Sequence, residues 1–126
     1  MTTLTEVIDP TCTVSRGPDG IVRARWADGL VITAAVARRG VEMVDTVSRG
    51  ALLPLLVDLS GIKSLTREAR AVYADTTNMS ALALLGDSPV TRVIANFAMN
   101  ISKPGVPTRF FTDVVAAEAF LAGFLP

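Results

Sequence analysis

Three aspartates stand at the ends of predicted buried strands, where side chains can bind a cation. Asp58, Asp87 and Asp113 each end an apolar run or follow it within two residues. The carboxyl ends of parallel strands meet at one edge of a sheet, and open α/β proteins bind ligands there. Carboxylate oxygens suit Mg²⁺. The pattern therefore allows a magnesium site, but ordinary turn and helix-cap chemistry explains the same three residues, and we favour that interpretation.

A second candidate site is the start of a predicted helix at Ser88. Ser88 is a favourable N-cap residue, Pro89 is a favourable first helical residue, and Arg92 follows one turn later. The free N–H groups of a helix start can bind an anion, and Gly86 lets the backbone approach it. Capping alone accounts for the same residues. The chain contains neither glycine-rich nucleotide motif.

The chain contains no histidine, which excludes several catalytic chemistries. Ser–His and Cys–His nucleophile pairs and histidine metal sites are impossible. Ser60 precedes Gly61 but lacks the flanking glycine frame of a nucleophile elbow. Cys12, the only cysteine, lies in a predicted strand, and we interpret it as a core residue. We therefore expect no enzymatic activity and no cofactor.

The composition indicates a single α/β domain over residues 1–126. Half of the residues are hydrophobic, and 12 basic residues balance 12 acidic ones, so nothing favours nucleic-acid binding. No apolar stretch approaches the roughly 18 residues that a membrane-spanning helix needs. The start of the sequence does not resemble a secretory signal, and a lone cysteine forms no internal disulfide. We therefore expect a cytoplasmic protein.

The N-terminal half is predicted to be a hairpin and a third short strand, followed by a helix. The turn at residues 17–20, Gly-Pro-Asp-Gly, favours the hairpin. Thr33 is the expected N-cap of the helix, and Gly50 is expected to close it as a left-handed residue. Gly40 lies on the apolar stripe of this helix, which predicts a close approach to the sheet. The predicted strands are residues 11–16, 21–26 and 30–32.

Three alternations of strand and helix follow. The strands have nearly continuous apolar sequence, as expected for strands buried on both faces, and cover residues 52–58, 80–85 and 108–111. The helices begin at about Thr66, at Pro89, and after the expected N-cap Thr112. In the second of them, Val90, Val93, Ile94 and Phe97 form an apolar stripe, and Pro104 ends the helix. This order predicts a mixed sheet, mostly parallel in its second half.

Residues 55–61, Leu-Leu-Val-Asp-Leu-Ser-Gly, resemble the corresponding strand and loop of STAS or SpoIIAA-like domains, the anti-sigma-factor antagonists. In those domains a helix beginning at a phosphorylatable serine follows, and their order of elements matches the predicted one. Residues 83–97 and 107–113 are similar to a group of uncharacterised actinobacterial proteins of that fold. The resemblance implies a fold and no established activity.

The chain departs from this family at the phosphorylation site. Thr66 stands where the antagonists have an aspartate, and Glu68 stands where they have the phosphorylated serine. Glu68 could mimic a permanently phosphorylated state. We favour the simpler interpretation, an ordinary acidic residue in the first turn of a helix.

These observations predict a SpoIIAA-like α/β domain that acts as a non-enzymatic binding or regulatory module and recognises a protein partner. The alternative is a carrier or sensor of a small apolar or anionic ligand held between helices and sheet, and an enzyme using the strand-end acids ranks last. The apolar excess near the C-terminus allows a homodimer. The candidate partner or ligand surface consists of Asp58, Ser60, Gly61, Thr66, Glu68, Asp87, Ser88 and Arg92.

Overall fold

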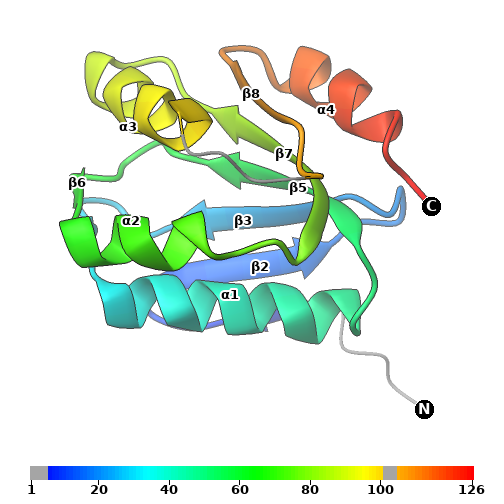
Figure 1. The fold of residues 1–126 in the computed structure, drawn as a ribbon, viewed down its shortest axis with the longest axis horizontal. Helices are drawn as coiled ribbons and strands as arrows, with labels where there is room; N and C mark the ends of the chain where they lie inside the picture. The colour runs from blue at the N-terminus through cyan, green and yellow to red at the C-terminus, as the bar shows by residue number, and fades with distance from the viewer. Residues whose placement is uncertain (1–5, 101–104) are drawn as a thin grey trace.

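The computed structural model describes residues 6–100 and 105–126 and has a six-stranded mixed sheet at its centre (Figure 1). The strand order is β1-β2-β3-β5-β7-β8. The first three strands pair in antiparallel fashion and are β1 (Glu6–Ile8), β2 (Cys12–Arg16) and β3 (Val22–Trp26). The other three continue the sheet in parallel from β3 and are β5 (Leu53–Asp58), β7 (Met79–Leu85) and β8 (Thr108–Phe111). The predicted hairpin and parallel half are both confirmed.

Strand β1 was not predicted from the sequence. It is a three-residue edge strand whose pattern is too short to recognise. The turn that returns it to β2 is organised by Asp9, whose Oδ1 accepts hydrogen bonds from the backbone N–H groups of Thr11 and Cys12 and from the Thr11 hydroxyl. These hydrogen bonds lower the pKa of Asp9, and the bond from the Thr11 hydroxyl contributes most.

The predicted strand at residues 30–32 exists but does not belong to the main sheet. It is β4 (Val31–Ile32), and it pairs in parallel with β6 (Ser64–Leu65), a strand that was not predicted. This pair joins the loop after β3 to the loop after β5. Two-residue strands are defined by the tertiary contact between two loops, so local sequence patterns do not reveal them.

Three of the four helices cover one face of the sheet, and the fourth covers the other. The helices are α1 (Ala34–Ser48), α2 (Arg67–Ala74), α3 (Pro89–Asn100) and α4 (Val114–Ala122). Each of the first three connects neighbouring parallel strands in the same direction across the sheet, and right-handed crossovers then place them on one face. Buried residues of α1, α2 and α3 accordingly join one core cluster, and those of α4 join a second cluster.

The helix starts follow the predicted capping chemistry with one exception. Thr33 and Thr66 are the N-caps of α1 and α2, and Pro89 begins α3. The N-cap of α4 is Asp113 and not Thr112, because the Asp113 carboxylate accepts the N–H of Val115 at 3.1 Å.

The predicted left-handed Gly50 at the end of α1 is confirmed at φ 78°, and Arg49 before it is also left-handed at φ 51°. The predicted end of α3 at Pro104 lies outside the described residues.

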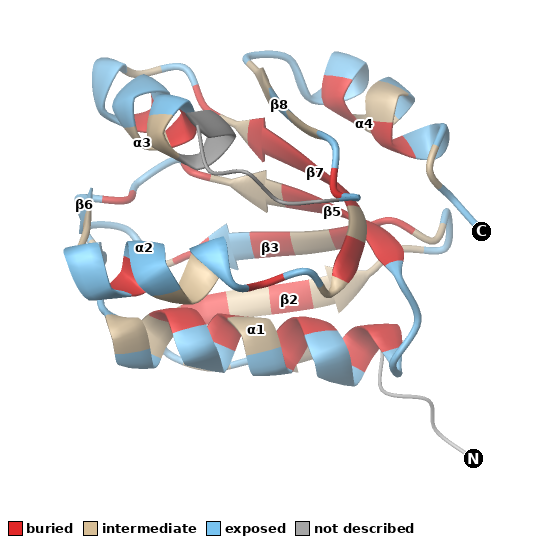
Figure 2. Cartoon of the chain, in the orientation of Figure 1, coloured by how far each residue is buried: buried red, intermediate tan, exposed pale blue. Residues whose placement is uncertain are grey.

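The central strands β5 and β7 are mostly buried (Figure 2). On β7, Leu82 and Leu84 face the cluster beneath α1, α2 and α3, and Ala81 and Ala83 face α4. Alternation along a strand sends successive side chains to opposite faces. The sheet therefore offers a leucine-rich face to three helices and a small-residue face to one.

Candidate functional site

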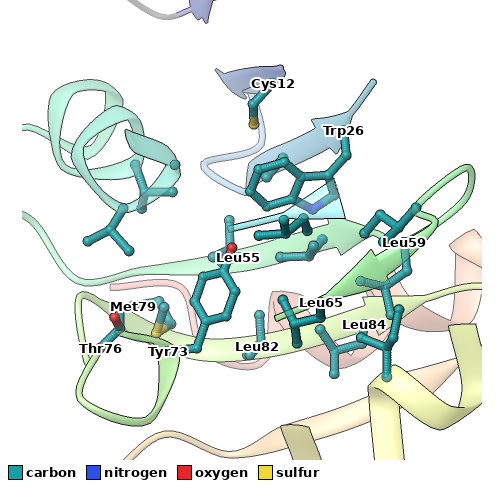
Figure 3. A pocket seen from close by; sticks show the side chains of 18 of the residues that line it. Cys12, Trp26, Leu55, Leu59, Leu65, Tyr73, Thr76, Met79, Leu82 and Leu84 are labelled. Carbon is teal, nitrogen blue, oxygen red and sulfur yellow. The ribbon is translucent and has the colours of Figure 1, made fainter. Parts of the chain in front are cut away.

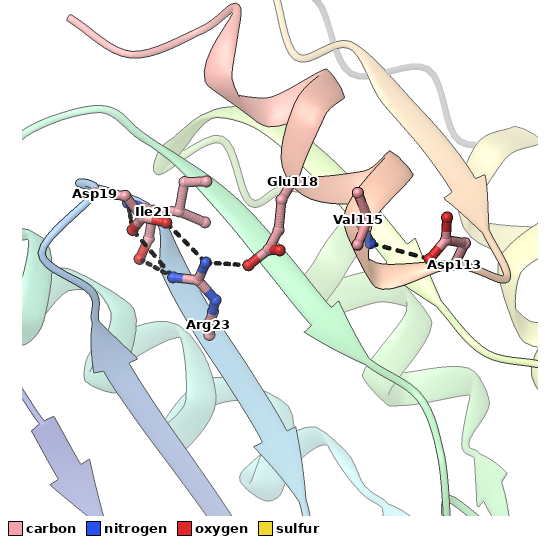
Figure 4. Close-up of polar contacts among 6 residues, drawn as sticks. All are labelled: Asp19, Ile21, Arg23, Asp113, Val115 and Glu118. Atoms are coloured by element: carbon pink, nitrogen blue, oxygen red, sulfur yellow. Dashed lines mark hydrogen bonds and ion pairs between the residues drawn. The ribbon is translucent and has the colours of Figure 1, made fainter.

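The strand-end aspartates serve their own loops. Asp58 accepts the N–H of Ser60 at 2.9 Å, and Asp113 caps α4 as described above (Figure 4). Asp87 is exposed. Among residues 6–100 and 105–126, no group of three or more His, Cys, Asp or Glu side chains is placed to hold a metal ion. Asp58 and Asp113 thus form a turn hydrogen bond and a helix-cap hydrogen bond, respectively.

The helix start at Ser88 is a reciprocal cap. The Ser88 hydroxyl accepts the N–H of Thr91 at 3.1 Å, and the Thr91 hydroxyl accepts the N–H of Ser88 at 3.0 Å. A Cβ atom at Gly86 would lie 2.5 Å from the Thr91 side chain, so this glycine is required by packing. Arg92 extends over the ring of Phe110, 5.1 Å from its centroid. Sequence reasoning missed Thr91, the partner in this cap.

The loop after β5 is held by its neighbours. Gly61 adopts φ +84°, and a Cβ atom there would collide with Asp28. The Gly61 carbonyl accepts the N–H of Gly29 at 2.7 Å, and the Leu59 N–H donates to the Leu85 carbonyl at 2.8 Å. Gly61 thus joins two loops by close packing.

The remaining candidates lie on α2. The Thr66 hydroxyl accepts the N–H of Ala69 at 3.2 Å, and Glu68 is exposed in the first turn. Asp58 is the last residue of β5, and the other seven predicted residues lie in the loops and helix starts beyond the carboxyl ends of β5 and β7. That they bind a partner or ligand stays a prediction.

A groove that the sequence did not predict lies beside this surface, between β6 and α3. We call it the α3 groove; its volume is about 350 Å³, and its lining includes Lys63, Arg70 and Phe97. The Arg70 guanidinium lies 4.5 Å from the centroid of the Phe97 ring. The ion pairs found among the described residues involve neither Lys63 nor Arg70.

The predicted apolar stripe of α3 is wrong at two valines, which lie on the groove and not in the core. Val90 and Val93 were expected to face the core, but their side chains are 47% and 69% exposed. Ile94 is half-buried, packs against the core and also lines the groove. The stripe is wider than the contact of α3 with the sheet, so its outer edge remains uncovered.

A second space, the core cavity, lies between the main sheet and the helices α1, α2 and α3 and is partly open (Figure 3). Its volume is about 100 Å³, and its walls are almost entirely apolar. Burial raises the pKa of the Cys12 thiol in this wall to about 11, which agrees with the predicted role of Cys12 as a core residue. Burial also raises the pKa of the Tyr73 hydroxyl above its ordinary value.

Three buried polar atoms of residues that line the cavity have no hydrogen-bond partner within the described part of the chain. They are Trp26 Nε1, the Tyr73 hydroxyl and Asn78 Oδ1, and we call them the cavity polar atoms. An unsatisfied buried polar group costs about 1–3 kcal/mol, and native proteins contain few of them. Sequence reasoning missed this site, although Gly40 on the stripe of α1 pointed to it. A Cβ atom at Gly40 would lie 3.0 Å from the Trp26 ring.

An uncharacterised DUF3478-family protein with a SpoIIAA-like fold from Shewanella loihica PV-4 superposes with a TM-score of 0.61, covering 96% of this chain and 98% of that chain at 16% identity. The chain has a SpoIIAA-like fold, so the predicted fold class is confirmed.

The family assignment is more specific. The chain belongs to the family described as domain of unknown function DUF7793, whose model matches residues 16–125. A protein of unknown function from Arthrobacter sp. FB24 is 41% identical over 86% of this chain and 97% of that chain, with a TM-score of 0.36. No curated protein matches the chain. In the described part of the chain, no helix has the length and apolar character needed to cross a membrane.

Proposed function

We propose that this domain is a non-enzymatic, cytoplasmic regulatory module that recognises a protein partner through the α3 groove and the adjoining start of α2. One observation supports this proposal above all. Val90 and Val93 are exposed on the groove. Beside them lie Lys63 and Arg70, whose cationic side chains have no acidic partner among the described residues. Exposed apolar surface bordered by polar groups is characteristic of interaction sites. The absence of histidine from the sequence supports a binding role over a catalytic one.

The chemistry of the groove indicates an acidic, amphipathic segment of the partner. Val90, Val93 and Phe97 offer apolar contacts along one face of α3. Lys63 and Arg70 stand where carboxylates of the partner can pair with them. The Phe97 ring holds the Arg70 guanidinium by a cation–π contact, so less side-chain freedom is lost on binding. Thr66 and Glu68 at the start of α2 would extend the same surface.

The test compares variants of two equally exposed valines on different helices. Val93→Asp places a charge in the groove, and Val115→Asp does the same on α4, where the valine is 68% exposed. Affinity purification from the native cells, followed by quantitative mass spectrometry, should show a partner retained by wild type and Val115→Asp and lost with Val93→Asp. Arg70→Glu should lose the same partner, and Arg25→Glu, an exposed arginine on β3, should keep it. Equal retention by all variants would refute the groove.

Glu68→Arg tests the predicted α2 surface separately. The exposed glutamate contributes no hydrogen bond to the described fold, so the variant should fold normally, and loss of the partner would place α2 in the interface. A second copy of the chain is the competing occupant. It would appear in sedimentation as a dimer that Val93→Asp dissociates.

The alternative function, a carrier or sensor of a small ligand, is supported by a different observation, the core cavity, and is developed below.

A further inference from the structure

We infer that the core cavity is a binding site for a small, neutral, mainly apolar molecule that both accepts and donates a hydrogen bond, such as a single-ring or short-chain alcohol. This inference goes beyond partner recognition and does not depend on it. It rests on the cavity polar atoms, which belong to residues from three separate parts of the chain that line one space.

The cavity polar atoms define the hydrogen-bonding character of the ligand. The indole Nε1 of Trp26 is only a donor, the amide Oδ1 of Asn78 is only an acceptor, and the hydroxyl of Tyr73 can be either. A molecule with one hydroxyl can satisfy a donor and an acceptor together. The protein groups are therefore complementary to an alcohol or a primary amide and would leave a pure hydrocarbon with unsatisfied neighbours.

The surrounding contacts hold two of these groups in place. The amide nitrogen of Asn78 donates to Asp45 Oδ1 at 2.9 Å and to the Val41 carbonyl at 3.3 Å, which leaves the amide oxygen without a partner in the described part. The Trp26 ring, 8% exposed, packs beneath Gly40, where a side chain would press on it. Figure 3 shows the Tyr73 hydroxyl directed across the cavity toward the side on which Trp26 lies. The contacts within the protein thus position Asn78 and Trp26 without a ligand.

The charge and the volume of the core cavity further restrict which ligands it can bind. No charged side chain is among the cavity lining of the described chain, so an anion would be left uncompensated. The volume of about 100 Å³ is several times what one water molecule requires, and an apolar cavity of about 150 Å³ accepts benzene in another protein. The core cavity is smaller than that one, so the ligand is at most about the size of one six-membered ring.

The experiment uses phenol and toluene as a matched pair of probes, because they have the same size and differ in one hydroxyl. Trp26 is the only tryptophan and Tyr73 the only tyrosine of the chain, so the fluorescence of Trp26 reports directly on the cavity. Phenol should change the emission of the full-length protein saturably and raise its Tm with concentration. Toluene should bind at least fivefold more weakly.

Two variants separate binding from general stability. Tyr73→Phe removes one cavity hydroxyl, raises the Tm of the free protein and should reduce the preference for phenol over toluene to less than twofold. Ser48→Ala removes a buried hydroxyl that also lacks a described partner but is not part of the cavity lining. It should raise the Tm and leave phenol binding unchanged. A response to phenol that never saturates, or an unchanged preference in Tyr73→Phe, would overturn the inference.

A filling variant provides an independent check. Ala24→Leu places three additional carbons in the cavity wall and should abolish saturable phenol binding in a protein that still unfolds cooperatively. Should Ala24→Leu fail to fold, the comparison of Tyr73→Phe with Ser48→Ala still decides the question. Retained phenol binding in folded Ala24→Leu would place the ligand elsewhere and refute the assignment.

Discussion

The two faces of the sheet are packed in opposite ways. Beneath α4, Ala81, Ala83 and Ala117 are completely buried, and small side chains let a helix lie close to the strands. Beneath α1 and α2, larger side chains leave the core cavity open. Large residues thus do not guarantee a filled interior, because side chains from a twisted sheet and two helices must match in shape as well as in volume.

Both faces have ion pairs at their rims, and on the α1 face Arg39 pairs with Asp9 and Glu42. On the α4 face, the Arg23 guanidinium bonds to Asp19 in the hairpin turn and to Glu118 on α4 (Figure 4). Phe120 packs between Phe111 and Phe124, with ring centroids 5.5 and 5.1 Å apart. Arg23 thus pairs with two acidic side chains at the edge of the α4 face. The α1 face differs in its interior, where the cavity polar atoms have no hydrogen-bond partner in the described part of the chain.

The largest expected effect comes from adding the same side chain to each face. Ala83→Leu adds three carbons to the close contact with α4 and should lower the free energy of unfolding by about 2–3 kcal/mol. Ala24→Leu adds them beside the core cavity and should change it by less than about 1 kcal/mol in either direction. Urea denaturation of both variants measures the difference, and equal destabilisation would contradict the contrast between the faces.

A smaller effect is expected from the ion pairs at the α4 rim. Hydrogen bonding from Arg23 lowers the pKa of Asp19 below its ordinary value of 3.8. The folded state therefore binds fewer protons than the unfolded state at acidic pH, so this stabilisation is present above pH 3.8 and is lost as the pH falls through the lowered pKa.

Asp19→Asn should accordingly reduce stability at pH 7 by less than about 1 kcal/mol, because the carboxylate is half-exposed and screened by water. The difference from wild type should vanish near pH 2, as measured by urea denaturation across pH. If the effect of Asp19→Asn on stability stayed constant down to pH 2, its cause would not be the charge of the carboxylate.

Phenol binding in the core cavity should not vary between pH 5 and 8. Cys12 and Tyr73 stay protonated in this range, because burial raises the pKa of both groups further above it.

The smallest expected effect links the cavity to the α3 groove. Leu65 and Ile94 line both spaces, so a molecule in the cavity presses on the wall of the groove. A thiol introduced by Val93→Cys should react with a labelling reagent about twofold faster or slower in saturating phenol. The native Cys12 should not react in this assay, because it is buried and its pKa is raised.

Val115→Cys is the control for this prediction, because it lies on α4 and should react at the same rate with and without phenol. An equal change in the labelling rate at both positions would indicate a general effect of the phenol solution on the reaction. No change at Val93→Cys would show that the cavity and the groove act independently.

Much of the fold could be predicted because it depends on neighbours along the chain. Threonine and serine caps start α1, α2 and α3 through hydrogen bonds to residues three positions ahead. The turn at residues 17–20 closes a hairpin through Asp19, which accepts the N–H of Ile21. The error at α4 has the same local origin, since Thr112 and Asp113 are both good caps and only the backbone angles distinguish them.

The candidate sites could be predicted much less well. The α3 groove depends on how much of the Val90–Phe97 stripe the sheet covers, and periodicity alone shows an apolar face without showing its partner. The core cavity depends on the residual volume among side chains from α1, α2, α3 and six strands. No local pattern contains that volume.

By itself, the sequence determined the caps, the hairpin, the alternation of strands and helices, and the absence of histidine chemistry, because each depends on residue type and near spacing. Tertiary structure alone decided that β4 pairs with β6, that Val93 stays exposed, and that Trp26, Tyr73 and Asn78 line one cavity. The physical reason is that exposure, pairing and empty volume are properties of segments brought together from distant parts of the chain.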